Sequence, residues 1–177
     1  MWIGVANGMF TQRSLWDSLR HRAERVPWGK WLWSRDGIPR HEFVSWMLFH
    51  CKLPTKDRLA RWGMQVGAAC VFCSCDESQD HLFFHCVFSA QVWRLMLQRL
   101  GVYRGSATWR VERQWYIDNV GGRSLQSRLM QVSFMCTVYV IWKEGNSRVF
   151  GGVPVSADVL FHRVVSIVHD RVCSWRG

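Results

Sequence analysis

Four potential metal ligands within seventeen residues constrain this chain more than any other feature of its sequence. Cys70, Cys73, His81 and Cys86 follow the spacing C-x2-C-x7-H-x4-C. Two cysteines separated by two residues can hold one face of a metal ion in a tight turn, and a later histidine and cysteine complete a tetrahedron. Because three thiolates and one imidazole leave no position for water, the spacing predicts one structural Zn²⁺ ion rather than a catalytic one.

Two neighbouring side chains offer alternative ligands. His85 forms an H-x3-H pair with His81, which would give a Cys2His2 site. The familiar Cys2His2 finger, however, has about twelve residues between its cysteine and histidine pairs, whereas only seven lie between Cys73 and His81. Cys75 lies two residues after Cys73, within the turn itself, and is more typical of a free thiol. The spacing therefore favours three cysteines and one histidine.

The composition indicates a packed protein. Of 177 residues, 49% are hydrophobic, and the 12 tryptophans and 10 phenylalanines exceed what a disordered chain carries. We expect one domain over residues 1–177, with basic tryptophan-rich helices at 1–63, the zinc knuckle and a following helix at 64–101, and C-terminal helices at 102–177. Seven cysteines are an odd number, and neither a secretory segment nor an Asn-x-Ser/Thr site is present. An intracellular location, in the nucleus or cytoplasm, is therefore expected.

Capping residues and helical spacing predict a mainly α fold, with a short N-terminal β-hairpin as an addition at residues 2–11 around Asn7-Gly8. Helices are expected at residues 14–22, 27–37, 39–50, 56–62, 90–100, 125–151 and 156–175. In the helix that starts at Pro39, an apolar stripe recurs at helical spacing, and we expect it to pack in the core. The stripe consists of Phe43, Trp46, Met47 and His50.

The charge distribution predicts a polyanionic partner, RNA or DNA. The net charge is +10, with +6 in residues 1–61, −1 in residues 62–101 and +5 in residues 102–177. We expect Lys56, Arg58 and Arg61 to contact phosphates. Phe72, within the knuckle, either stacks on an unpaired base or packs beneath the zinc. No membrane association is expected, because the longest apolar stretch, residues 129–142, is shorter than the roughly 20 residues that a bilayer requires.

The sequence contains none of the catalytic motifs that we sought. No G-x-x-x-x-G-K-[ST] loop occurs, and His41-Glu42 lacks the second histidine of an H-E-x-x-H helix. Asp118 is a single carboxylate where two-metal polymerase chemistry needs several. We therefore expect no enzymatic activity and no small-molecule substrate. Lys143 and Glu144 are expected to form an exposed charge pair on a helix.

Several motifs occur in a characteristic order. They are Ile38-Pro39, Leu53-Pro54-Thr55-Lys56-Asp57-Arg58-Leu59, Cys70-x2-Cys73, His81-Leu82-Phe83-Phe84-His85-Cys86, Trp93, and residues 141–150 with the sequence IWKEGNSRVF. Together they resemble the zinc-binding domain that lies C-terminal to the reverse transcriptase in plant LINE-type non-LTR retrotransposons. The resemblance extends from about Phe10 to Phe150 and implies the same four zinc ligands. The family usually has an arginine at the position of Gly145, so this chain lacks one charge there, and glycine weakens a helix interior by roughly 1 kcal/mol.

Two hypotheses of function follow. The first is a non-catalytic accessory module that binds RNA or DNA through its basic flanks. The alternative is a structural or protein-interaction module that docks on a polymerase, such as a reverse transcriptase in trans, or on a host partner, since tryptophan and arginine are also enriched at protein interfaces. Steep salt dependence of binding would favour nucleic acid.

Overall fold

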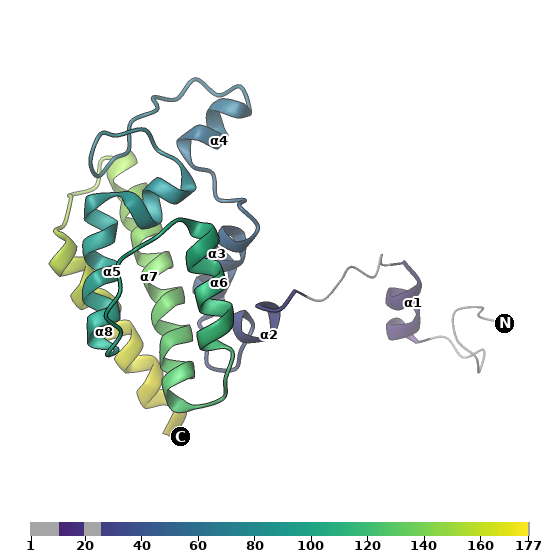
Figure 1. Ribbon diagram of the computed structural model, residues 1–177. Helices are drawn as coiled ribbons and strands as arrows, with labels where there is room; N and C mark the ends of the chain where they lie inside the picture. Colours follow the sequence, from purple (N-terminus) through teal and green to yellow (C-terminus); the bar gives the residue numbers. More distant parts are fainter. Residues whose placement is uncertain (1–10, 20–25, 177) are drawn as a thin grey trace.

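The computed structural model describes residues 11–19 and 26–176, and their regular structure is almost entirely helical (Figure 1). The helices are α1 (Gln12–Leu19), α2 (Gly29–Leu32), α3 (Pro39–Phe49), α4 (Lys56–Arg61), η1 (His81–His85), α5 (Val87–Arg99), α6 (Trp109–Val120), α7 (Leu125–Val149), α8 (Ala157–Cys173) and η2 (Ser174–Arg176). The described residues contain no β-strand, only one antiparallel bridge between Ala69 and Asp76. This confirms the mainly α prediction, whereas the predicted hairpin falls almost entirely outside the described residues.

Helix α7 forms the centre of the helical body, with α3, α5, α6 and α8 packed around it (Figure 1). Every residue from 130 to 138 is buried, as expected of a helix that is surrounded by others. Phe134 illustrates the packing, because its ring contacts rings from α3, α5 and α6 at centroid distances of 4.3 to 6.5 Å. These rings belong to Phe49, Trp93, Trp109 and Tyr116. In the described part of the chain, no helix is long and apolar enough to cross a membrane.

Two N-terminal helix boundaries differ from the prediction. Helix α1 begins at Gln12 because Thr11, not Ser14, caps it: the Ser14 N–H donates to Thr11 Oγ1, and the Thr11 N–H donates to Ser14 Oγ, each at 3.0 Å. Helix α2 ends at Leu32 instead of continuing toward Gly37. The Ser34 N–H donates to Glu42 Oε1, at 3.2 Å, rather than to a helical carbonyl. Gly37 permits this approach, since a Cβ there would lie 1.7 Å from Glu42 Oε1.

Two further differences affect the middle of the chain. Helix α5 begins at Val87 with Cys86 as its N-cap residue, so Ser89 lies buried in the first turn and does not cap the helix. Helix α6 was not predicted at all. Its buried positions, Trp109, Glu112, Tyr116 and Val120, follow helical spacing, and Thr108 precedes them at the N-cap. This pattern was a usable signal that the sequence analysis missed.

The expectation for the aromatic stripe of α3 was wrong for Phe43 and His50 but not for Trp46 and Met47. The helix buries His41, Val44, Ser45, Leu48 and Phe49. Within the stripe, Phe43 is 52% exposed and His50 is exposed, whereas Trp46 and Met47 are half-buried and pack against the core. The inner face also buries Glu42, and His41 and Glu42 both find partners there, whereas the buried Ser45 hydroxyl has no hydrogen-bond partner among the described residues. His41, for example, stacks on Tyr139 at 4.1 Å and lies 3.3 Å from Cys136 Sγ.

Candidate metal centre

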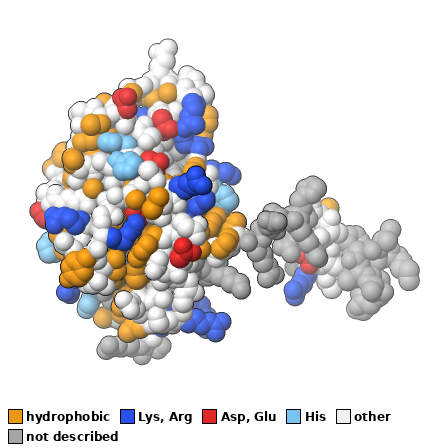
Figure 2. All heavy atoms as spheres, viewed as in Figure 1, with side chains coloured by type: hydrophobic (Ala, Val, Ile, Leu, Met, Phe, Trp, Pro, Cys, Tyr) orange, Lys and Arg blue, Asp and Glu red, His pale blue; other side chains and the backbone are white. Residues whose placement is uncertain are grey.

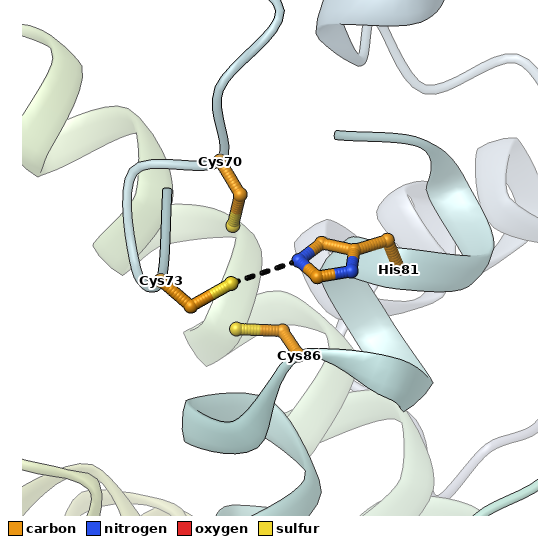
Figure 3. A group of neighbouring side chains, drawn as sticks. All are labelled: Cys70, Cys73, His81 and Cys86. Carbon is orange, nitrogen blue, oxygen red and sulfur yellow. Dashed lines mark hydrogen bonds between the residues drawn. The ribbon is translucent and has the colours of Figure 1, made fainter. Parts of the chain in front are cut away.

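The structure brings the four predicted metal ligands together (Figure 3). One ligand atom from each of Cys70, Cys73, His81 and Cys86 lies within 4.8 Å of all the others. The Cys73 Sγ and His81 Nε2 atoms are 3.0 Å apart. In a tetrahedral zinc site the ligand atoms are separated by about 3.4 to 3.8 Å, given the usual Zn–S and Zn–N bond lengths. Small adjustments of these side chains, with Cys73 and His81 moving slightly apart and the more widely separated atoms moving closer, would therefore complete a site for one Zn²⁺ ion.

Cys70 and Cys73 are placed by a tight turn between Ala69 and Asp76. The Cys70 N–H donates to the Cys75 carbonyl at 2.6 Å, and the Ser74 N–H donates to the Cys70 carbonyl at 3.0 Å. Ser74 has a φ of 63°, the left-handed conformation that lets the chain reverse here. The Phe72 N–H also points at Cys70 Sγ, at 3.4 Å. The turn thus presents two sulfur atoms on the same side of the loop.

His81 and Cys86 are placed by η1, which is one turn of π-helix. The Cys86 N–H donates to the His81 carbonyl at 2.7 Å, so two residues five positions apart lie on one side of the turn. Between them, Leu82, Phe83 and Phe84 are all buried. Phe84 stacks on Trp93 and on Trp109, each at 5.7 Å between centroids. The second half of the site is therefore fixed by the hydrophobic core.

The protonation of the Cys70 and Cys86 thiols favours binding of a cation. The pKa of Cys70 is lowered to about 5, chiefly by a hydrogen bond from the Cys86 thiol, with smaller contributions from the backbone N–H groups of Phe72 and Cys73 that act against the effect of burial. The same hydrogen bond, together with burial, raises the pKa of Cys86. The two cysteines share one proton, and a zinc ion that coordinates both thiolates would displace it.

The two alternative ligands lie outside this group. His85 is exposed, as is Cys75, and neither belongs to the set of converging ligand atoms. The arrangement therefore favours the Cys3His site over the Cys2His2 site. A hydrogen bond with Cys73 raises the pKa of Cys75, so Cys75 is predominantly a neutral thiol at physiological pH.

The predicted phosphate-binding residues lie on α4, and each has a partner within the protein. The Lys56 amine donates to the Ala69 carbonyl, and Arg61 pairs with Asp57 at 2.5 Å. The Arg58 guanidinium lies 5.1 Å from the ring centroid of Trp62. Since exposed ion pairs contribute little energy, these contacts leave the cations able to bind phosphate. Their role in nucleic-acid binding stays a prediction.

Phe72 packs against the protein. Its ring stacks on Phe88 with 4.5 Å between centroids, and the Arg148 guanidinium lies within 4.8 Å of both rings. A Cβ at Gly145 would meet the Phe72 ring at 3.5 Å, an ordinary contact, so the turn at residues 69–76, called the zinc loop below, packs close to α7 and would still admit an alanine at this position. The ring is half-buried, which agrees with the packing alternative. Stacking of Phe72 on a base stays a prediction.

Two glutamates near the site have roles that the sequence analysis did not identify. Glu77, which follows the turn, is buried and accepts the Lys56 N–H at 3.0 Å, which ties α4 to the zinc loop. Glu144 was expected to be exposed beside Lys143, but it is 4% exposed. Its carboxylate pairs with Arg148 at 2.8 Å and accepts the Val155 N–H at 3.1 Å. The i, i+4 spacing of Glu144 and Arg148 was the available signal.

Comparison with known proteins supports the zinc assignment. Residues 10–93 match the family described as zinc-binding in reverse transcriptase. The match includes α1 to α4 and all four converging ligands, and ends within α5. No match was found among curated proteins or among solved structures. The matched segment and the Cys3His cluster together identify a structural zinc site, and residues 10–93 are similar to the zinc-binding segment found in reverse transcriptases.

Proposed function

We propose that this chain is a zinc-stabilised accessory module that binds RNA or DNA and has no catalytic activity of its own. We further propose that it derives from the reverse transcriptase of a plant LINE-type retrotransposon, and that it acts in the nucleus or cytoplasm. The resemblance in the motif order supports the origin. The charge distribution on the folded chain supports the partner.

The position of the glutamates carries this proposal. All four glutamates in the described residues are buried, and each accepts a backbone N–H. The pairs are Glu42 with Ser34, Glu77 with Lys56, Glu112 with Ala107 and Glu144 with Val155. Because these four carboxylates are buried and make contacts inside the protein, the net charge of the exposed side chains is more positive than the sequence alone suggests. A positive exterior attracts phosphates at long range.

Many of the cations are free to act on a partner. Arg99, Arg110 and Arg123 are exposed and form no salt bridge with any described residue. Figure 2 shows the face formed by α5 and α6, where Lys and Arg side chains are spread among hydrophobic ones and do not gather into one patch. A spread of charge favours binding of low sequence preference over recognition of one site.

The nature of the zinc site supports a non-catalytic role. Four protein ligands fill a tetrahedral zinc, so no coordination position remains for a water or a substrate. Asp118, the single carboxylate considered above for two-metal polymerase chemistry, is exposed and accepts a hydrogen bond from Gln114 at 2.9 Å. We therefore expect Asp118→Ala to leave every nucleic-acid binding property unchanged, and we expect no magnesium-dependent primer extension by the protein.

An apolar groove favours the alternative, docking on another protein. The groove has a volume of about 270 Å³ and lies between α4, the zinc loop and the end of α7. Its apolar lining includes Leu59, Val66, Val71, Trp142 and Val149. A hydrophobic side chain of a polymerase or host protein would fit such a groove.

A binding titration separates the two functions. Fluorescently labelled single-stranded RNA, single-stranded DNA and duplex DNA are titrated with zinc-loaded protein at two salt concentrations. Replacing Lys56, Arg58 and Arg61 together with Gln should reduce the slope of log affinity against log salt on single strands by about 2, given about 0.7 per phosphate contact. Replacing Arg99, Arg110 and Arg123 with Gln in a separate variant measures how much of the slope comes from the exposed cations outside α4. A protein that binds none of these nucleic acids at low salt would refute the proposal and favour docking.

A further inference from the structure

The outer face of α3 presents aromatic rings to solvent in a row. Phe43 stacks on Trp46 with 6.0 Å between centroids and 20° between planes. Trp46 in turn lies 4.7 Å from the His50 ring, one turn further along the helix. Phe43 is 52% exposed, which is unusual for a phenyl ring that has a core available to it. We call Phe43, Trp46 and His50 the aromatic row.

Two rings of the row are held by the core, since Trp46 packs against it and His50 contacts a buried tryptophan. Trp28 is buried beneath the row and contacts the His50 ring at 5.2 Å, edge to face. Trp28 also packs on Phe49, a core residue of α3, at 4.7 Å. Rings that are already held in place lose little conformational entropy when a flat ligand stacks on them.

Two cations lie beside the row. Arg40 is exposed one turn before Phe43, and the Lys52 amine lies 5.5 Å from the ring centroid of Trp46. Neither Arg40 nor Lys52 forms a salt bridge with a described residue. The one acidic residue of α3, Glu42, is buried on the opposite side and bonded to the Ser34 N–H. The exposed side of the helix therefore combines aromatic faces with unopposed cations.

We propose that the aromatic row is a stacking site for the bases of single-stranded nucleic acid, with Arg40 and Lys52 contacting the flanking phosphates. Flat rings flanked by cations match a strand in which bases and phosphates alternate, and every base has a face that can stack. The phosphates require positive charge without nearby carboxylates, which this face provides. A duplex keeps its bases stacked on one another, so it cannot use the row. This inference rests on the proposed nucleic-acid binding and assigns its single-strand site to α3 rather than to Phe72.

The test compares Phe43→Ala with wild-type protein on oligouridylate, oligothymidylate and a duplex of the same length, by fluorescence anisotropy. Loss of one stacked base costs about 1 to 3 kcal/mol, so single-strand affinity should fall about 5- to 150-fold while duplex affinity and the salt slope stay constant. Phe43→Trp should retain the affinity. Tyr103→Ala is the matched control, because Tyr103 is an 83% exposed ring in the loop between α5 and α6. Phe43 is exposed, so its removal should leave the fold intact, which circular dichroism checks.

Charge variants give an independent readout. Replacing Arg40 and Lys52 with Gln should reduce the single-strand salt slope by about 1.4, at about 0.7 per contact. If wild-type protein binds single strands but Phe43→Ala binds them equally well, the stacking site is refuted while nucleic-acid binding stands, and a protein becomes the better occupant of the row. An equal loss on single strands and duplex would also refute stacking. If wild-type protein binds no nucleic acid, both proposals fail. Comparison of oligouridylate with oligothymidylate shows whether RNA or DNA is preferred.

Discussion

Replacing Cys86 with Ser should release the zinc, whereas His85→Ala and Cys75→Ser should leave it bound. Cys86 Sγ is one of four atoms that converge within 4.8 Å, and His85 and Cys75 are exposed outside that group. Changes to residues that merely support zinc ligands cost about 10- to 100-fold in affinity, so loss of a ligand should cost at least about 100-fold. Elemental analysis of purified protein gives the stoichiometry, and competition with a chromogenic chelator gives the affinity.

The structural consequence should be confined to part of the zinc segment. Burial of Leu82, Phe83 and Phe84 contributes roughly 1.5 to 3 kcal/mol for each side chain, so η1 has about 5 to 9 kcal/mol of support that does not depend on metal. The turn at residues 69–76 has only a few backbone hydrogen bonds, each contributing about 0.5 to 1.5 kcal/mol. Structural zinc supplies roughly 10 to 16 kcal/mol in small fingers. Metal loss should therefore loosen the turn before η1 and α5.

Hydrogen exchange read by mass spectrometry measures this difference. In Cys86→Ser, amides of residues 68–77 should exchange faster, while those of α5 and α7 should stay protected. His85→Ala provides the control with intact metal. One bound zinc in Cys86→Ser together with zinc loss in His85→Ala would refute the ligand assignment. Loss of protection throughout α5 and α7 would refute the argument that the core holds η1.

Three further outcomes are expected. In zinc-loaded protein, a thiol reagent should label the exposed Cys51, Cys75 and Cys173 first, and removal of zinc by a chelator should make the three ligand cysteines reactive as well. Burial raises the pKa of Cys136 to about 12, so Cys136 should react only in denaturant. Mass spectrometry counts the labels, and early labelling of Cys136 would contradict its burial. Glu144→Ala should destabilise the protein by about 3 to 5 kcal/mol in urea unfolding, because it leaves the half-buried Arg148 without a counter-ion and the Val155 N–H without an acceptor. Asp57→Ala, which breaks an exposed pair, should cost at most about 1 kcal/mol, and equal effects of the two changes would contradict the buried pair. Burial, and then the charge of Lys143, lower the pKa of His41 from 6.5 to about 4. As the pH falls, the unfolded chain therefore binds a proton at His41 before the folded protein does, and the free energy of unfolding should decrease between pH 6.5 and pH 4. His41→Gln should flatten this part of the plot of stability against pH, and an unchanged plot would contradict the pKa shift.

The elements that the sequence predicted well have short-range causes. Ser124 and Ser156 cap α7 and α8 by accepting the N–H of Ser127 and of Val159, and such caps act over three residues. Pro39 begins α3 because proline suits the first turn of a helix. The four metal ligands lie within one short segment, so their spacing was enough to identify them.

The elements that the sequence predicted badly depend on contacts between distant segments. Whether α3 buries Phe43 or His41 is decided by Cys136 and Tyr139 of α7, almost a hundred residues away. Hydrophobicity alone predicts that the side of α3 with Phe43 is buried. A histidine that has a partner in the core cannot be told from a surface histidine in the sequence, so the burial of His41 was not predicted. Glu144 was assigned to the surface for the same reason, since its partner N–H at Val155 belongs to a later loop.

The zinc loop also supports the basic helix α4, which connects the metal to the proposed partner. Lys56 is the first residue of α4, and two hydrogen bonds connect it to the zinc loop. The carboxylate of Glu77, which directly follows the loop, accepts the Lys56 N–H, and the Lys56 amine donates to the Ala69 carbonyl. Helix α4 has six residues, too few to be stable alone, and none of them is buried. Its position therefore depends on the loop, and the loop depends on the metal. The aromatic row of α3, by contrast, rests on Trp28 and Phe49 in the core. Zinc loss should accordingly weaken binding through α4 while the stacking site on α3 keeps its geometry.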